Sequence, residues 1–210
     1  NFSLSNKAKN YDFNATINQI QQEFNLAGYD LNIKHSSERT VHSALLKFSG
    51  ILNETGPSPL KDQKIIIKVE IDTNPPRGGV ETNSVYKSTF MFYTLHYDLP
   101  SLLAGKIHAL LCREYAKGRD WYDLLWYMGK SKELEPNFTM LNNAMAQTEK
   151  NPIELTSENW KDEIKKVAKT LDWKKLRDDV GRFLEDQTDL RLLELDTFIN
   201  LTRNNINCIL

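Results

Sequence analysis

The sequence predicts an α+β protein, and three observations support this fold class. Strand-like runs fill the front half, the strongest being KIIIKVEID at residues 64–72, which is rich in β-branched residues. Helical patterns dominate from Asp98 to the C-terminus. Of the 210 residues, 40% are hydrophobic and 26% charged, as in ordinary globular proteins. We expect one domain over residues 1–97 and a helical domain over residues 98–210.

The first domain should begin with an extended segment, NFSL, followed by a helix. Phe13, Ile17, Ile20 and Phe24 are spaced four, three and four residues apart, which places them on one face of a helix that ends by Gly28. Further strands are expected in YDLNIKHS, in TVHSALLKFSGIL up to Gly50, in KIIIKVEID and in the aromatic run SVYKSTFMFYTLHY. The segments NETGPSPLKDQ and TNPPRGG are loops by composition.

Charge and cysteine content exclude several classes of protein. The net charge of −1 creates no global basic field for nucleic acid, so any such contact needs a local patch. No run approaches the ~20 apolar residues of a membrane span. Without a secretory signal the expected location is the cytoplasm. Cys112 and Cys208 are too few and too far apart for a disulfide framework or a zinc site.

Glu70 and Asp72 form the first candidate site. Alternate residues of a strand share a face, and two neighbouring carboxylates repel each other unless a cation or solvent relieves them. Hard cations such as Mg²⁺ prefer oxygen ligands of this kind. The alternative is a solvent-facing strand on which Lys68 pairs with Glu70.

Lys106 is the second candidate, within the expected helix DLPSLLAGKIHALLCREY. It lies within or beside an apolar helix face, where a lysine must extend its ammonium to solvent, pair with a carboxylate or contact an anionic ligand. His108 points to the other side and is expected at the surface. The apolar face comprises Leu102, Leu103, Ile107, Leu110 and Leu111.

The stretch AKGRDWYDLLWY, residues 116–127, places two carboxylates among aromatic residues. Asp120 at a helix start fits capping and the helix dipole. Capping explains Asp123 less well, because Asp123 follows one turn later. The i, i+3 spacing puts the two carboxylates on one face of the helix. Trp121 and two leucines should form the buried side of the helix.

A basic segment follows at residues 160–183. Acidic residues are interleaved with the basic ones, which favours a solvated helical face over a contact with the RNA backbone. The basic residues are Lys161, Lys165, Lys166, Lys169, Lys174, Lys175, Arg177 and Arg182.

Taken together, KVEIDTNPP, YDLPSLLAGKIHALLCR and KGRDWYDLLWY resemble, in this order, the nucleotidyl transferase AbiEii/AbiGii toxin family. The resemblance covers nearly the whole chain. It implies a DNA polymerase β-like nucleotidyltransferase fold, with a mixed sheet, flanking helices and a helical C-terminal region. It also implies a toxin of an abortive-infection toxin–antitoxin pair, with an NTP such as GTP as substrate, Mg²⁺ as cofactor, RNA such as transfer RNA as acceptor, and a cognate antitoxin.

The resemblance assigns roles to individual residues. Glu70 stands where the family has a catalytic strand carboxylate, with Asp72 as its helper, so both are candidate metal ligands. Lys106 matches the family's helix lysine, a catalytic residue that binds nucleotide phosphate. Asp120 and Asp123 match catalytic acids of the GRD-x-YD motif. In the same motif Arg119 and Tyr122 are candidate nucleotide-binding residues.

One departure concerns the family's Gly-Gly/Ser and Asp-x-Asp motifs. Asn1 occupies the place of the second metal-binding aspartate, and the preceding segment is missing from the sequence. Because phosphoryl transfer depends on metal-held phosphates, Mg²⁺ binding should be weak or absent. The alternatives to a toxin enzyme are therefore a truncated, inactive member or binding module that keeps the fold, and a nuclease that uses Glu70 and Asp72.

Overall fold

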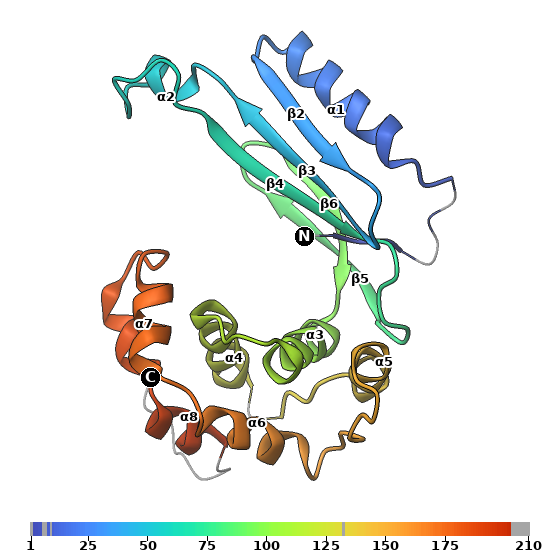
Figure 1. The fold of residues 1–210 in the computed structure, drawn as a ribbon, viewed down its shortest axis with the longest axis vertical. Coiled ribbons are helices and arrows are strands. Elements are labelled where there is room, and N and C mark those ends of the chain that lie inside the picture. The colour runs from blue at the N-terminus through green and yellow to red at the C-terminus, as the bar shows by residue number, and fades with distance from the viewer. Residues whose placement is uncertain (1, 6–7, 9, 132, 203–210) are drawn as a thin grey trace. The chain divides into compact units, whose positions relative to one another are not determined.

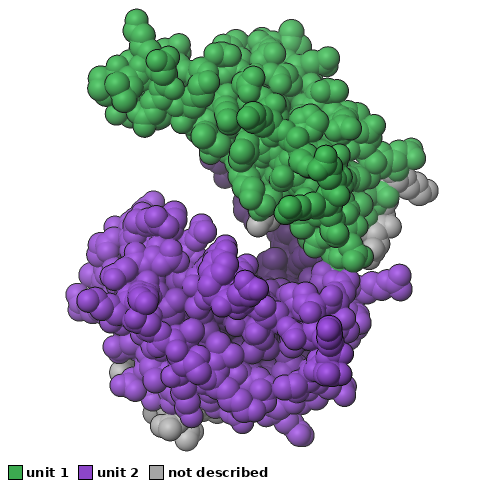
Figure 2. All heavy atoms as spheres, in the orientation of Figure 1, with its two compact units in different colours: residues 1–75 green, residues 76–210 purple. Residues whose placement is uncertain are grey.

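The computed structural model describes residues 2–5, 8, 10–131 and 133–202. Two compact units divide the chain, residues 1–75 and residues 76–210 (Figure 2). The β-hairpin that follows residue 75 groups with the helices, whereas the domain boundary expected from the sequence lies after it, at residue 97. Asn1 and Cys208, both considered above, lie outside the described residues.

The first unit is a four-stranded mixed sheet with one long helix against it (Figure 1). The strand order is β1-β4-β3-β2, in which β1 runs parallel to β4 and the other pairs are antiparallel. This mixed α/β content agrees with the predicted nucleotidyltransferase-like fold. The elements are β1 (Phe2–Ser3), α1 (Phe13–Leu26), β2 (Leu31–Ser36), β3 (Val41–Phe48), α2 (Ile51–Glu54) and β4 (Ile65–Asp72).

Helix α1 confirms the predicted apolar face at Phe13 and Ile17, whereas Phe24, predicted on the same face, is 37% exposed at the edge of the core. It begins where the Asp12 side chain accepts a hydrogen bond from the Ala15 amide at 3.0 Å. Phe13 and Ile17 are buried against strand residues such as Leu31 and Phe48. The helix ends ahead of Gly28, whose φ of +87° favours glycine.

The second unit opens with a hairpin of β5 (Glu81–Lys87) and β6 (Met91–Tyr97). The expectation of one strand-like run over residues 84–97 is therefore wrong, because the chain reverses within it. At the turn the Ser88 amide donates to the Phe90 carbonyl at 3.1 Å. Aromatic and β-branched composition predicts extended backbone but does not reveal where the direction changes.

The remaining helices pack around one core, as the C-terminal part of the sequence predicts. At its centre the indole of Trp121 meets the rings of Trp173 and Phe198, each with centroids 5.5 Å away. The elements are α3 (Leu99–Cys112), α4 (Gly118–Lys130), α5 (Phe138–Thr148), α6 (Trp160–Ala168), α7 (Trp173–Gly181), the 3₁₀ helix η1 (Gln187–Leu192) and α8 (Leu195–Thr202).

Two details of α3 differ from expectation. Leu102, predicted on the apolar face, is 37% exposed, because the buried stripe runs through Leu103, Ile107 and Leu110 and Leu102 lies about 100° away from Leu103. His108 is half-buried rather than at the surface, and its Nε2 lies 3.0 Å from the Thr148 hydroxyl. Burial lowers the pKa of His108, so this imidazole is neutral at pH 7.

Candidate functional site

Helix α3 carries Lys106 beside the buried stripe. The helix starts at Asp98, whose carboxylate accepts a hydrogen bond from the Ser101 amide at 2.9 Å. Lys106 precedes Ile107, which is completely buried, while the Lys106 side chain is 25% exposed. The aliphatic stem is therefore partly covered, and the ammonium needs a partner.

Helix α4 supplies that partner, and Gly118 fixes where α4 begins. The Gly118 amide donates to Asp179 Oδ2 at 2.9 Å, and a Cβ on Gly118 would overlap the carbonyl oxygen of Leu176 in α7. Only glycine permits this close approach of two helices. Asp120 then falls in the first turn of α4 and Asp123 one turn later.

Lys106, Asp120 and Asp123 meet in one ion-pair cluster. The ammonium nitrogen lies 3.1 Å from Asp120 Oδ1 and 2.6 Å from Asp123 Oδ2. Asp120 also accepts a hydrogen bond from the guanidinium of Arg113. Asp120 thus binds cations with both oxygens and does not cap the helix, which corrects the capping interpretation, although its place in the first turn of α4 agrees with the predicted helix-dipole interaction. The shared face predicted for the two carboxylates is confirmed, and we call these four residues the lysine–aspartate cluster.

The charge state of Lys106 follows from this geometry. Burial lowers the pKa of Lys106, but hydrogen bonds and charge interactions with Asp123 and Asp120 outweigh burial and raise the pKa above its ordinary value. Lys106 is therefore a cation at neutral pH and cannot serve as a base there. An ammonium group has three donors, and two are used by the aspartates, so one remains for a further anion.

The two other predicted nucleotide-binding residues of α4 have different partners. The Tyr122 hydroxyl donates to Asp189 Oδ2 at 2.7 Å. This hydrogen bond and burial raise the pKa of Tyr122 to about 12. The guanidinium of Arg119 lies over the ring of Phe183, 4.6 Å from its centroid. Among the interactions of the described residues, neither side chain has a hydrogen bond or ion pair with Lys106.

Glu70 and Asp72 belong to the first unit and lie on β4. Glu70 is paired across the sheet with Ser43, and its carboxylate lies 2.5 Å from the Lys68 ammonium, which confirms the predicted pairing. Asp72 Oδ1 accepts a hydrogen bond from the Asn74 amide at 2.9 Å. No group of three or more acidic, histidine or cysteine side chains able to hold a metal occurs within the described part of the chain.

These two carboxylates nevertheless suit a magnesium ion that also binds substrate. Mg²⁺ commonly uses one or two protein carboxylates and completes its shell with water and phosphate oxygens. Glu70 and Asp72 each retain a second carboxylate oxygen beyond the contacts just given. When the metal binds, the Glu70 carboxylate would release its ion pair with Lys68 and bind the metal instead.

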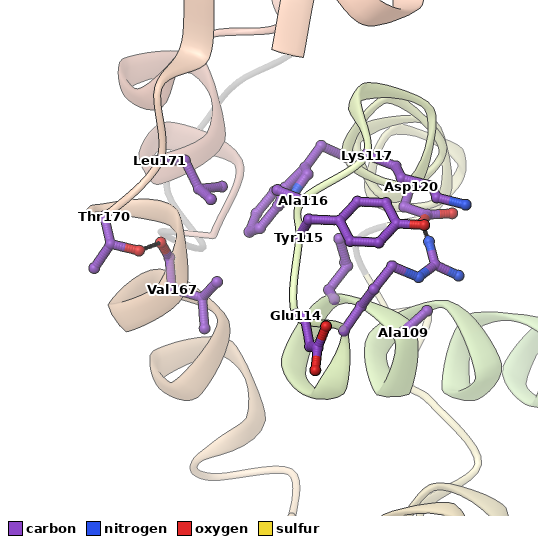
Figure 3. A pocket seen from close by; sticks show the side chains of 12 residues that line it. Ala109, Glu114, Tyr115, Ala116, Lys117, Asp120, Val167, Thr170 and Leu171 are labelled. Carbon is purple, nitrogen blue, oxygen red and sulfur yellow. Dashed lines mark hydrogen bonds and ion pairs between the residues drawn. The ribbon is translucent and has the colours of Figure 1, made fainter. Parts of the chain in front are cut away.

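Sequence reasoning missed Arg113, although a signal for it existed. The signal was a basic residue directly after the helix that carries Lys106: Arg113 is the extended residue that follows the end of α3 at Cys112. Its guanidinium, Tyr115, Lys117 and Asp120 line a cavity of about 160 Å³ between the α3–α4 connection and the end of α6 (Figure 3). That volume is below the 300–1,000 Å³ typical of small-molecule sites, so the cavity holds at most part of a nucleotide.

Comparison with known proteins identifies the family. A family model described as nucleotidyl transferase AbiEii toxin, type IV toxin–antitoxin system, matches residues 2–199. No curated protein and no solved structure matches the chain significantly. No helix among the described residues is both long and apolar enough to cross a membrane. Because the matched region includes the sheet, the hairpin and the helices that carry the lysine–aspartate cluster, the chain belongs to the nucleotidyl transferase AbiEii toxin family of type IV toxin–antitoxin systems.

Proposed function

We propose that this nucleotidyltransferase-family toxin, in its full-length form, transfers a nucleotide from an NTP, GTP among them, to an RNA acceptor such as transfer RNA. The observation that carries the proposal is the lysine–aspartate cluster. A protonated lysine that keeps one free donor beside two carboxylates suits a phosphate-binding cation whose position is fixed by acidic neighbours.

Lys106 would bind a phosphate of the NTP. In phosphoryl transfer the protein contributes positioning and charge stabilisation more than covalent chemistry. The two aspartates hold the ammonium in one place before substrate arrives, so that less side-chain entropy is lost on binding. Asp120, only 14% exposed and also bonded to Arg113, is the more constrained of the two acids.

Glu70 and Asp72 are the proposed metal ligands. A bound Mg²⁺ would supply charge neutralisation at the phosphates. The protein's own part is to keep both carboxylates on one strand face, where Lys68 neutralises Glu70 in the metal-free state. We also propose that the toxin has a cognate antitoxin, which a toxin–antitoxin system requires. Its proposed location is the cytoplasm.

Labelled GTP, RNA and Mg²⁺ provide a direct test. The full-length toxin should transfer label to RNA, and Lys106→Ala and Asp120→Ala should each lower the rate at least about 100-fold, because each removes one member of the charged cluster. Lys130→Ala is the matched control, since Lys130 lies on α4 over the exposed ring of Trp126, 4.8 Å from its centroid. Transfer that survives in Lys106→Ala would refute the assigned role of Lys106, and RNA cleavage without transfer would refute the proposed reaction.

A further inference from the structure

Two exposed aromatic rings flank the start of α4, and each has a cation over it. Tyr115 is 62% exposed, and the Lys117 ammonium lies 5.4 Å from its ring centroid. Phe183 is 51% exposed, and the guanidinium of Arg119 lies 4.6 Å from its ring centroid. What these two positions share is a cation over an exposed ring, so that an aromatic face and a positive charge are both open to a ligand.

Most of the charge at this surface is available to a ligand. Arg182 lies 4.8 Å from the centroid of the Phe183 ring and forms an ion pair with Asp179 at 3.4 Å. Lys117 and Arg119, by contrast, have no carboxylate partner among the described residues. Two acidic groups lie nearby, Glu114 next to Tyr115 in the sequence and Asp179, which accepts from the Gly118 amide, so three basic side chains against two acidic ones leave the local balance positive.

Packing holds these side chains at one end of the helical unit. Gly118, which separates Lys117 from Arg119, lies against α7 at Leu176, and Phe183 follows the end of α7. We call Tyr115, Lys117, Arg119, Arg182 and Phe183 the basic–aromatic cluster. It adjoins the lysine–aspartate cluster, because Arg119 precedes Asp120 and because Tyr115, Lys117 and Asp120 line the same cavity (Figure 3).

We propose that the basic–aromatic cluster binds the RNA acceptor as an unpaired strand. This inference rests on the proposed function, because it assigns the acceptor a place beside the candidate catalytic residues. Aromatic rings and guanidinium planes accept any unpaired base by stacking, and nearby unpaired cations bind the phosphates between the bases. Bases in a duplex are stacked on each other and leave the rings without a partner, so a single strand should bind better than a duplex.

Binding can be tested without catalysis. The probe is a fluorescein-labelled single-stranded RNA of about 12 nucleotides, within the range that a single-strand site covers. Fluorescence anisotropy with the full chain gives the Kd at several salt concentrations. We expect the double variant Tyr115→Ala/Phe183→Ala to bind about tenfold more weakly, because two stacking surfaces are lost. Lys117→Ala/Arg119→Ala should weaken binding and flatten the salt dependence, because two phosphate contacts are lost.

The same helix offers a matched control. Trp126 is 48% exposed and has Lys130 over its ring, so it repeats the aromatic–cation arrangement at the other end of α4. Trp126→Ala/Lys130→Ala should leave the Kd for RNA unchanged. Thermal unfolding followed by circular dichroism verifies that each variant is folded. We expect all of them to fold, because the substituted side chains lie at the surface rather than in the core.

The outcomes separate this inference from the proposed function. Weaker RNA binding in both cluster variants, with unchanged binding in the Trp126 control, supports the inference. Equal losses in the control variant, equal affinity for a duplex of the same length, or no binding of RNA by the unmodified chain would each overturn it. A failure of RNA binding at this cluster would not refute the proposed function, because GTP binding that depends on Lys106 is measured separately. The proposed reaction is tested by the transfer assay with labelled GTP.

Discussion

The chain has two pairs of closely spaced acidic residues, one on a strand and one on a helix, and they differ in where their neutralising cations come from. Glu70 and Asp72 share a strand face, and Asp120 and Asp123 share a helix face. On the strand the neutralising charge comes from Lys68, two residues away in the same strand. On the helix it comes from Lys106 in α3 and from Arg113, the residue directly after α3. A local pair can be predicted from spacing, while a pair made across elements depends on how those elements pack.

The two lysines that neutralise these pairs also differ in burial. The Lys68 side chain is 57% exposed, whereas that of Lys106 is 25% exposed. Ion pairs in water contribute little, because solvent screens the charges and two long side chains lose freedom. The helix cluster should therefore matter for both stability and function, and the strand pair should matter little for stability.

The largest expected effect on the free energy of unfolding comes from a substitution that separates α4 from α7. Gly118→Ala forces a methyl group into the Leu176 carbonyl oxygen, so α4 and α7 must separate. We expect the free energy of unfolding to fall by about 3 kcal/mol, measured by urea denaturation. Gly129→Ala, on the same helix, is the control. Nothing lies within 4 Å of its added Cβ, and it should be neutral or stabilise by about 0.5 kcal/mol. Equal effects at the two glycines would show that the close contact at Gly118 has no energetic importance.

Removing the ammonium group from the helix cluster should have the next largest effect. Lys106→Met keeps most of the apolar stem but leaves Asp123 without a cation, and we expect a loss of about 2 kcal/mol in urea denaturation. Exposure of a quarter of the Lys106 side chain keeps the figure below that of a fully buried pair. The double variant with Asp123→Asn should lose less than the sum of the two single losses, and strict additivity would contradict the ion pair.

The contribution of Lys106 should also depend on pH in a defined direction. Its pKa is raised in the folded protein by Asp123 and Asp120 despite burial, so its stabilising effect is fully present below the unfolded-state pKa of about 10.4. The difference in unfolding free energy between the unmodified chain and Lys106→Met should stay constant from about pH 7 to about pH 9 and shrink above about pH 10. A difference that grows with rising pH would have the wrong sign.

Tyr122 tests a smaller contact on the same helix. Tyr122→Phe removes the hydrogen bond to Asp189 and should cost about 1 kcal/mol. Since the pKa of Tyr122 is raised to about 12, its contribution is present below about pH 10 and is lost as the pH approaches 12. Ultraviolet titration should show a tyrosine that ionises near pH 12, and Asp189→Asn should shift this transition to lower pH. A late transition that persists in Asp189→Asn would assign it to another residue.

The smallest effect is expected at the strand pair. Lys68→Met should change the free energy of unfolding by no more than about 0.5 kcal/mol, because the side chain is mostly in solvent. In the transfer assay the same variant should retain activity, since Lys68 only neutralises Glu70 when metal is absent. A large stability loss at Lys68 would erase the contrast between the two acidic pairs.

Several features of the fold could be predicted from local patterns. The spacing of Phe13 and Ile17 predicts α1, β-branched composition predicts β4, and the aromatic side of α4 predicts the burial of Trp121. The hairpin of β5 and β6 could not be separated from a single run, because its turn residues, Ser88 and Thr89, are a weak signal. The exposure of Leu102 was missed because its neighbour Leu103 defines the buried stripe.

What the sequence determined by itself is which residues share a face. The i, i+3 spacing of Asp120 and Asp123 and the alternation of Glu70 and Asp72 follow from helix and strand geometry alone. Tertiary structure decided which charges meet: Lys106 on α3 and Arg113 directly after it reach the aspartates of α4 because α3 and α4 pack against each other. The physical reason is that an ion pair needs atoms within a few ångströms, and such distances between separate elements are set by packing.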